Sequence, residues 1–299
     1  MKEYFIDLGS STIKVYELFE TLKLIDEHSI YFKNGFTEEY GISNENRQEL
    51  FECFADWIKR FNMRFENTYI YVTGIFRNLN KQLKQNLIKD FNDKLDLHIS
   101  IISHGIENYY LGKAMSNDYN NKKVMIINMG GKTTEIVTFK GNEISDRKNL
   151  KIGVAEILNK FHAVNDEISG VKIEEINEFV KEQLKGVSFD TDYDCAIFTG
   201  GEERFEKLTK FNLVPNNSFD DGIHKYKISY NDYIKGTNKV FYKIKLQELY
   251  QLMPSNPKWM DGARAGAVLP LAIFDLAKIK EIVPSDLNLI NGVINDLKN

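Results

Sequence analysis

Apolar residues in the first part of the chain follow first a strand period and then a helix period. In "EYFIDLGSSTIKVYEL" (residues 3–18), two β-branched and aromatic runs flank small polar residues, which predicts a strand, a tight turn and a second strand. The segment "KLIDEHSIYF" (23–32) predicts a third strand of this meander. From Asn44 to Phe65 the apolar residues recur at spacings of three and four, which predicts a helix capped by Ser43 or Asn44.

The next elements alternate between strands and helices up to a polar stretch. A buried strand over 69–72 ends in Thr73-Gly74, and Arg77 lies in the loop beyond it. A charged helix over 80–95, a strand ending at Ser103 and a helix beginning near His104, with Glu107 in its first turn, follow. Residues 116–123 are rich in Asn and Lys, which is typical of a surface connection, and we predict the domain boundary there.

The second half repeats the opening pattern. "KKVMIINMGGKTTEIVTFKGNEI" (122–144) again predicts a strand that ends in an amide or acid, a glycine turn and a returning strand, which indicates an internal duplication. "YDCAIFTGGEERFEKL" (193–208) predicts a strand that runs through Gly200-Gly201 into a helix. The last part predicts an apolar helix interrupted by Pro270, a short strand and a terminal helix.

Length and composition favour a two-domain cytoplasmic protein. The chain of 299 residues is longer than a single hydrophobic core usually supports, so we predict two domains, over 1–119 and 120–299. The net charge of −4 offers no general attraction for nucleic acid or an anionic membrane, and neither a signal peptide nor a membrane span is visible. Cys53 and Cys195 form no C-x-x-C pair, so buried core residues are favoured over a metal site.

The glycine turns are the candidate chemistry. "GGKT" at 130–133 is typical of the end of a Walker loop, but the first glycine of that motif would fall on Ile126, so the match fails. Consecutive N–H groups of a glycine turn can instead form an anion-binding concavity, with Ser10, Ser11, Thr12, Thr133 and Thr134 as further donors. A purely structural hairpin is the alternative for one such turn, whereas two related turns followed by Gly200-Gly201 favour phosphate binding. Asp7, Asn128 and Glu135 supply oxygen ligands of the kind that Mg²⁺ prefers.

In order and spacing these segments resemble the exopolyphosphatase and guanosine pentaphosphate phosphatase (Ppx/GppA) family, within the actin, sugar kinase and heat-shock chaperone ATPase superfamily. "IDLGSST" (6–12) is similar to the family's "IDLGSNS", "VTGIFRN" (72–78) to an "AT-S-R" strand end, and "IISHGIEN" (101–108) to "ISG-x-E-E-A". "INMGGKTTE" (127–135) is similar to "IDIGGGSTE", and "LKIGVAEILNKF" (150–161) to "LPLGAVRLTERF". Gly200-Gly201 and Arg264-Ala265-Gly266 are similar to "GGTAR" and "RAD".

The resemblance implies an α/β fold of two ribonuclease H-like (actin-like ATPase) domains, each a mixed sheet flanked by helices, with an interdomain cleft. It implies that phosphates contact the turns listed here: Gly9, Ser10, Ser11, Thr12, Gly130, Gly131, Lys132, Thr133 and Thr134. Arg77 would clamp a phosphoryl oxygen and Glu107 would be the general base, with Asp7, Asn128 and Glu135 at a Mg²⁺ or another divalent cation. A surface ion pair for Arg77 and a helix cap for Glu107 are the structural alternatives.

The implied activity is phosphoanhydride hydrolysis, with inorganic polyphosphate ends or guanosine pentaphosphate as substrate. A homodimer is a further possibility that the sequence does not decide. Two departures from the family pattern lie beside the chemistry: Asn128 replaces an Asp, and Lys132 replaces a third glycine. A weakened family member that binds a phosphorylated ligand as a sensor is therefore the alternative function. An actin-like ATPase is a third hypothesis, against which Glu202 and Glu203 argue at the third turn.

Overall fold

A computed structural model describes residues 2–115, 119, 121–141, 143–218 and 223–298. The chain divides into two compact units, residues 1–107 with 289–291, and residues 108–288 with 292–299. The sequence-based boundary after residue 119 falls later, beside residues that lie outside the described ones. The chain changes unit earlier because Leu111, Ala114 and Met115 already pack into the core of the second unit.

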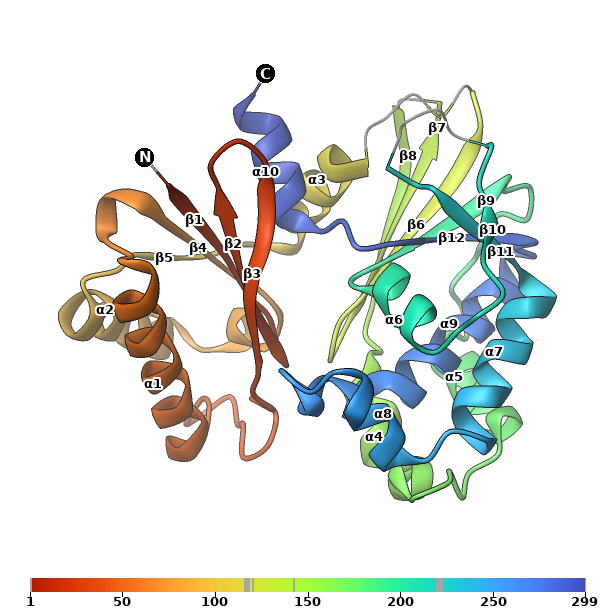
Figure 1. Ribbon diagram of the computed structural model, residues 1–299, viewed down its shortest axis with the longest axis horizontal. Helices are drawn as coiled ribbons and strands as arrows, with labels where there is room; N and C mark the ends of the chain where they lie inside the picture. The colour runs from red at the N-terminus through yellow and green to blue at the C-terminus, as the bar shows by residue number, and fades with distance from the viewer. Residues whose placement is uncertain (1, 116–118, 120, 142, 219–222, 299) are drawn as a thin grey trace. The chain divides into compact units, whose positions relative to one another are not determined.

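The first unit contains a mixed sheet in the order β3-β2-β1-β4-β5 (Figure 1). Its strands are β1 (Glu3–Leu8), β2 (Thr12–Leu18), β3 (Leu22–Ser29), β4 (Thr68–Val72) and β5 (Ile99–Ile101). β1, β2 and β3 form the predicted antiparallel meander, whereas β4 and β5 pair in parallel with β1 and with each other. The alternation of the sequence places Tyr4, Ile6 and Leu8 in one buried cluster.

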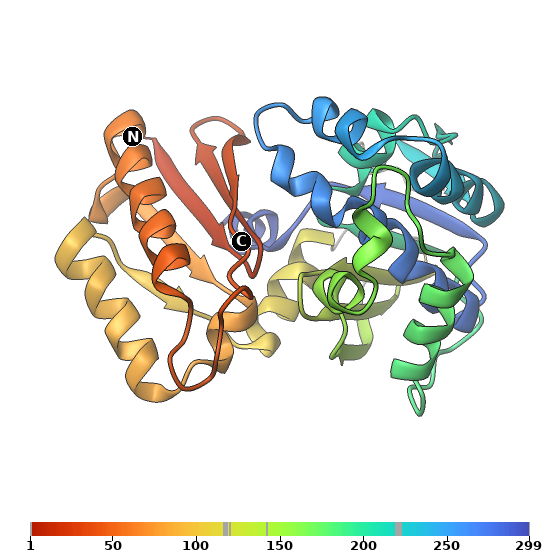
Figure 2. The same cartoon turned by 90° about the horizontal axis from the view of Figure 1, so that it is seen from below.

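Helices α1 (Asn44–Phe61) and α2 (Lys81–Leu95) lie side by side along one face of this sheet (Figures 1 and 2). Ser43 caps α1 by accepting the Asn46 N–H at 3.2 Å, which confirms the predicted start. The helix ends before the predicted Phe65 because Asn62 adopts a left-handed conformation, φ 55°, and its N–H returns to the Ile58 carbonyl.

The second unit contains a seven-stranded sheet in the order β10-β11-β12-β9-β6-β7-β8. Its strands are β6 (Lys123–Met129), β7 (Thr134–Lys140), β8 (Glu143–Leu150), β9 (Cys195–Thr199), β10 (Val214–Pro215), β11 (Tyr226–Ser229) and β12 (Glu281–Ser285). β6, β7 and β8 form an antiparallel meander, and β9 and β12 continue from β6 in parallel. The series β8-β7-β6-β9-β12 repeats β3-β2-β1-β4-β5, so the predicted duplication is confirmed.

Buried residues of the second sheet alternate strictly between two cores. Met125 and Ile127 of β6 face a large cluster with most of the helices, whereas Val124 and Ile126 face α3 (His104–Met115). The helices of this unit are α4 (Val154–Lys160), α5 (Ile173–Gln183), α6 (Glu202–Leu208), α7 (Tyr230–Tyr242), α8 (Leu246–Leu252) and α9 (Ala263–Leu276). The last helix, α10 (Leu289–Leu297), begins with residues of the first unit. None of the described helices combines the length and apolar character that crossing a bilayer requires.

Pro270 and Cys195 both lie in the packed interior of the second unit. Pro270 does not interrupt its helix, because α9 runs through it from Ala263 to Leu276. This helix is almost entirely buried, and its packing outweighs the hydrogen bond that proline removes. Cys195 is buried among apolar residues and burial raises the pKa of its thiol to about 12, as expected for a core cysteine.

Arg264, at the first turn of α9, binds together loops that are distant in sequence. Its guanidinium is fully buried and donates at 2.6–3.3 Å to the backbone carbonyls of Val164, Asp166, Glu167, Val240 and Ile244. Loss of hydration lowers the pKa of this group. The arginine that we matched to the "RAD" motif therefore organises the fold of the second unit.

Replacing Arg264 with Met should lower the free energy of unfolding by about 3–5 kcal/mol, because several buried carbonyls lose their donor at once. Urea unfolding followed by circular dichroism measures the change. The control is Arg147→Met on the exposed side of β8, which should change the value by less than about 0.5 kcal/mol. Equal effects of the two substitutions would contradict the structural role of Arg264.

Candidate functional site

The first glycine turn joins β1 to β2 and is closed by its own backbone. The Gly9 N–H donates to the Thr12 carbonyl at 3.1 Å, and a Cβ on Gly9 would lie 3.2 Å from that oxygen. Ser10 is buried, and its Oγ accepts the N–H of Ile75 at 2.9 Å. Gly74 has φ +63°, and a Cβ there would lie 1.9 Å from the Ser10 Oγ. The turn is therefore packed against the end of β4.

The second glycine turn joins β6 to β7 with the same closure. The Gly130 N–H donates to the Thr133 carbonyl at 2.8 Å, and a Cβ on Gly130 would again lie 3.2 Å from the carbonyl oxygen. The carbonyls of Gly130 and Gly131 accept the N–H groups of Val154 and Ala155 at 3.1 and 2.9 Å. The two turns are thus equivalent parts of the duplicated unit.

Hydroxyl groups of the second turn are engaged within the unit. Thr134 is fully buried and donates to the Ile152 carbonyl at 2.8 Å, so its hydroxyl fixes the turn. Thr133 donates to the Glu135 Oε1 at 2.7 Å and thereby orients that buried carboxylate. Thr134 is a positioning residue in this arrangement, and Thr133 links the turn to a predicted cation ligand.

Arg77 and Glu107 form a buried ion pair in the first unit. Arg77 lies on the 3₁₀ segment η2 (Gly74–Asn78), and Glu107 lies in the first turn of α3 as predicted. The Arg77 Nη1 donates to the Glu107 Oε2, and the two side chains are only 9% and 8% exposed. The sequence offered a surface ion pair and a helix cap as alternatives, whereas these two residues bind each other in a buried setting.

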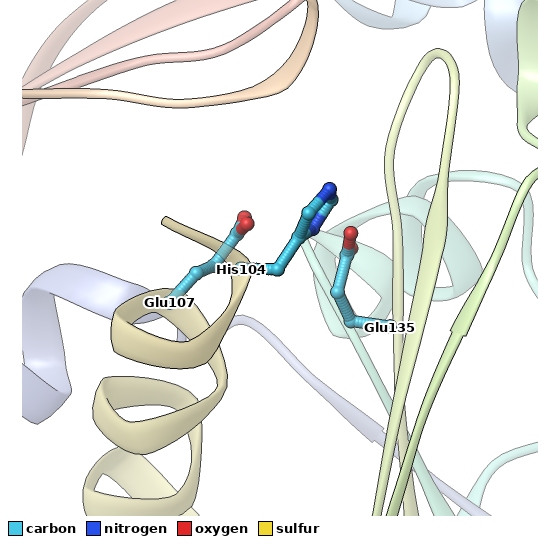
Figure 3. Close-up of side chains that lie close together, drawn as sticks. All are labelled: His104, Glu107 and Glu135. Atoms are coloured by element: carbon cyan, nitrogen blue, oxygen red, sulfur yellow. The ribbon is translucent and has the colours of Figure 1, made fainter. Parts of the chain in front are cut away.

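His104 is a site residue that sequence reasoning missed. It precedes Glu107 by one helical turn, and a ring nitrogen of His104 lies within 4.8 Å of a Glu107 carboxylate oxygen (Figure 3). Glu135, which Figure 3 also draws, belongs to β7 of the second unit. The His-x-x-Glu spacing is visible in the sequence and matches the i, i+3 pairs that bind metals on helices, so this signal could have found it.

Asp7 lies at the end of β1, two residues before the first turn. Loss of hydration raises the pKa of its carboxyl to about 6, and the charges of Lys14 and Arg77 oppose that rise. Lys14 is its partner in the β1–β2 register. Asp7 therefore lies among positive charges of its own unit.

A polar row crosses the second sheet where β6 ends. The strand registers pair Ser285 with Thr199, Thr199 with Asn128, Asn128 with Glu135 and Glu135 with Asn149. Paired residues of neighbouring strands share a face, so these five side chains line one edge of the sheet. Glu135 is the single charged member of this polar row.

The third glycine turn is acidic. Gly200 and Gly201 adopt φ +124° and +118°, and the Asp286 carboxylate accepts the N–H of Arg204 at 3.1 Å beside them. Glu206 of α6 is fully buried, and neither carboxylate oxygen has a hydrogen-bond partner among the described residues. Burial, followed by the charges of Glu202, Asp286 and Glu203, raises the pKa of Glu206 well above its usual value.

Known proteins match this chain in sequence and in fold. The sequence model of the Ppx/GppA phosphatase family matches residues 22–299. The Aquifex aeolicus member of that family is 18% identical, with a TM-score of 0.70 over 100% of this chain and 97% of the other. An exopolyphosphatase from Cytophaga hutchinsonii is 13% identical, with a TM-score of 0.74 over 99% and 97%.

A third structure, an exopolyphosphatase-like protein, is 15% identical, with a TM-score of 0.76 over 99% of this chain and 97% of the other. At these low sequence identities the structures show a shared fold. They confirm the predicted two-domain actin-like class with two mixed sheets flanked by helices. Comparison with curated proteins gives no match.

Replacing Gly74 with Ala tests the packing of the first turn. The new Cβ would collide with Ser10 and force a shift, so we expect a loss of about 1–3 kcal/mol beyond the backbone strain. The matched control is Gly186→Ala, which has φ +87° but no atom within 4 Å of its Cβ. Urea unfolding of both variants gives the difference, and equal losses would contradict the steric constraint.

Replacing Glu206 with Gln tests the buried carboxyl. A carboxyl whose pKa is raised on folding loses stability as pH rises above its unfolded value, since the folded state holds the proton more tightly. The Gln variant has no carboxyl proton to lose, so its stability relative to the parent should increase as the pH is raised from 4.5 to 8. Thermal unfolding at both pH values measures this, with the exposed Glu178→Gln as control. A pH-independent difference would refute it.

Proposed function

The chain belongs to the Ppx/GppA phosphatase family, and from that premise we propose that it hydrolyses terminal phosphoanhydride bonds. The observation that carries the proposal is the buried Arg77–Glu107 pair in the unit that also holds the first glycine turn. Inorganic polyphosphate ends and the terminal phosphate of guanosine pentaphosphate are the proposed substrates. The name of the Cytophaga structure favours the first of them.

In this proposal Glu107 is the general base. The ion pair with Arg77 uses its Oε2 and holds the carboxylate in one orientation. A carboxylate has two oxygens and about four lone-pair sites, so the same group can accept a proton from an attacking water. Phosphoryl transfer depends mainly on positioning and charge neutralisation, and Arg77 supplies a positive charge next to the base.

The glycine turns are the proposed phosphate-binding elements. Gly9 to Thr12 would serve in the first unit and Gly130 to Thr134 in the second. The N–H groups of Gly9 and Gly130 close their own turns, so the proposed donors are backbone N–H groups of the residues that follow. Asp7, Asn128 and Glu135 each offer a side-chain oxygen, the ligand atom that suits Mg²⁺, and His104 adds a nitrogen next to Glu107. A bound divalent cation would neutralise phosphate charge, while the chain's own residues orient water and substrate.

A weakened family member that senses a phosphorylated ligand is the second proposal. Asn128 supports it, because the polar row contains Glu135 as its single carboxylate. An ATPase is disfavoured by the acidic third turn, where Glu202, Glu203 and Asp286 place negative charge at the position expected for an adenosine. Thermal shifts with ATP, pentaphosphate and polyphosphate distinguish these functions by the ligand that stabilises the protein.

Glu107→Gln tests the catalytic proposal. Removing a general base should lower phosphate release from polyphosphate or pentaphosphate in Mg²⁺ by about 10²–10⁴-fold. The matched control is Glu45→Gln, an exposed glutamate in the first turn of α1, which should leave the rate unchanged. Full activity of Glu107→Gln would exclude its role as base, and absence of turnover in the parent protein would favour the sensor.

A further inference from the structure

The peptide orientation of the second turn directs two backbone N–H groups away from α4. The carbonyls of Gly130 and Gly131 accept hydrogen bonds from Val154 and Ala155 at the start of α4. No peptide bond of the described chain is cis, and in a trans peptide the N–H is opposite to the carbonyl. The N–H groups of Gly131 and Lys132 therefore point together to the side opposite α4.

Gly153 fixes this orientation. A Cβ at Gly153 would lie 2.5 Å from the Gly130 carbonyl oxygen and 2.6 Å from the Lys132 nitrogen. The turn and the start of α4 are thus in direct main-chain contact, and the two peptides cannot rotate without losing it. Two N–H groups held in parallel form the concavity that binds phosphate oxygens.

Lys132 carries a full positive charge on a residue of the turn itself. It lies at the tip of the turn, is only partly exposed, and has no positive φ, so the turn accepts the side chain without backbone strain. An ammonium group on a flexible stem can reach a phosphate oxygen next to its own backbone N–H.

The neighbouring strand ends provide little negative charge to hold a divalent cation. In the polar row, Ser285, Thr199, Asn128 and Asn149 are neutral, and the Glu135 Oε1 already accepts the Thr133 hydroxyl. Protein-bound Mg²⁺ is usually held by one or two carboxylates together with substrate phosphates. At the second turn the charges of one carboxylate, Glu135, and one ammonium, Lys132, cancel, so these side chains carry no excess negative charge for a divalent cation.

We propose that Lys132 neutralises phosphate charge at the second turn, so that this turn binds oligophosphate without a divalent cation. The inference rests on the proposed phosphate-binding role of the turn and concerns how its charge is balanced. The ligand class is a short inorganic polyphosphate, whose oxygens would accept from the N–H groups of Gly131 and Lys132 and from the Lys132 ammonium.

Calorimetric titration of the full chain with inorganic tripolyphosphate in EDTA tests the proposal. The parent protein should bind, and Lys132→Gln should bind about 10–100-fold more weakly, the range for losing one charged hydrogen bond. Lys132→Arg keeps the charge and should retain binding within a few fold. Lys185→Gln, at a side chain that is 77% exposed and paired with Glu182, is the control for general charge and should not change binding.

No binding in EDTA, or equal binding by the parent and Lys132→Gln, would overturn the proposal. Unfolding midpoints of the variants show whether weaker binding comes from misfolding, and the Arg variant separates charge from side-chain size. Phosphate release in Mg²⁺ is measured in parallel. Binding in EDTA without turnover would leave this inference standing and defeat the hydrolase proposal, whereas turnover without binding in EDTA would do the reverse.

Discussion

Each of the two glycine turns depends on a point where another segment lies too close for a side chain. In the first unit Gly74 occupies that point beside Ser10, and in the second unit Gly153 occupies it beside Gly130. Backbone hydrogen bonds then hold the turns: Thr73 donates to the Leu8 carbonyl, and Val154 to the Gly130 carbonyl. The donors of each turn are fixed by the sheet and its neighbouring segment, which is the preorganisation that anion binding requires.

The duplication explains why the predicted site residues lie at strand ends. β1 and β6 occupy the same position in their sheets, between an antiparallel partner and a parallel one. A turn that follows either strand therefore opens at the carboxyl edge of the parallel strands, where α/β proteins place their ligands. The same argument places η2 after β4 and the acidic third turn after β9.

Much of this arrangement could be predicted because it is local. The strand–turn–strand units, the Ser43 cap and Glu107 in the first turn of α3 follow from period and turn chemistry over a few residues. The role of Arg264 could not be predicted, since its five acceptors come from segments 20 to 100 residues away. The pairing of Arg77 with Glu107 spans 30 residues and likewise depends on the tertiary fold. The predicted interruption at Pro270 was wrong because the packing of an almost entirely buried helix outweighs the local effect of proline.

The two turns have the same backbone structure, but the side chains at equivalent positions of their flanking strands differ in charge. In the first unit the register pairs Asp7 with Lys14, and in the second it pairs Asn128 with Glu135. The strand before the turn carries Asp7 in the first unit and Asn128 in the second. The strand after the turn carries Lys14 in the first unit and Glu135 in the second. Because the backbone is common to both units, these side chains set the chemistry. Within the proposed function, the first unit supplies a base paired with arginine, and the second supplies a phosphate turn with its own cation.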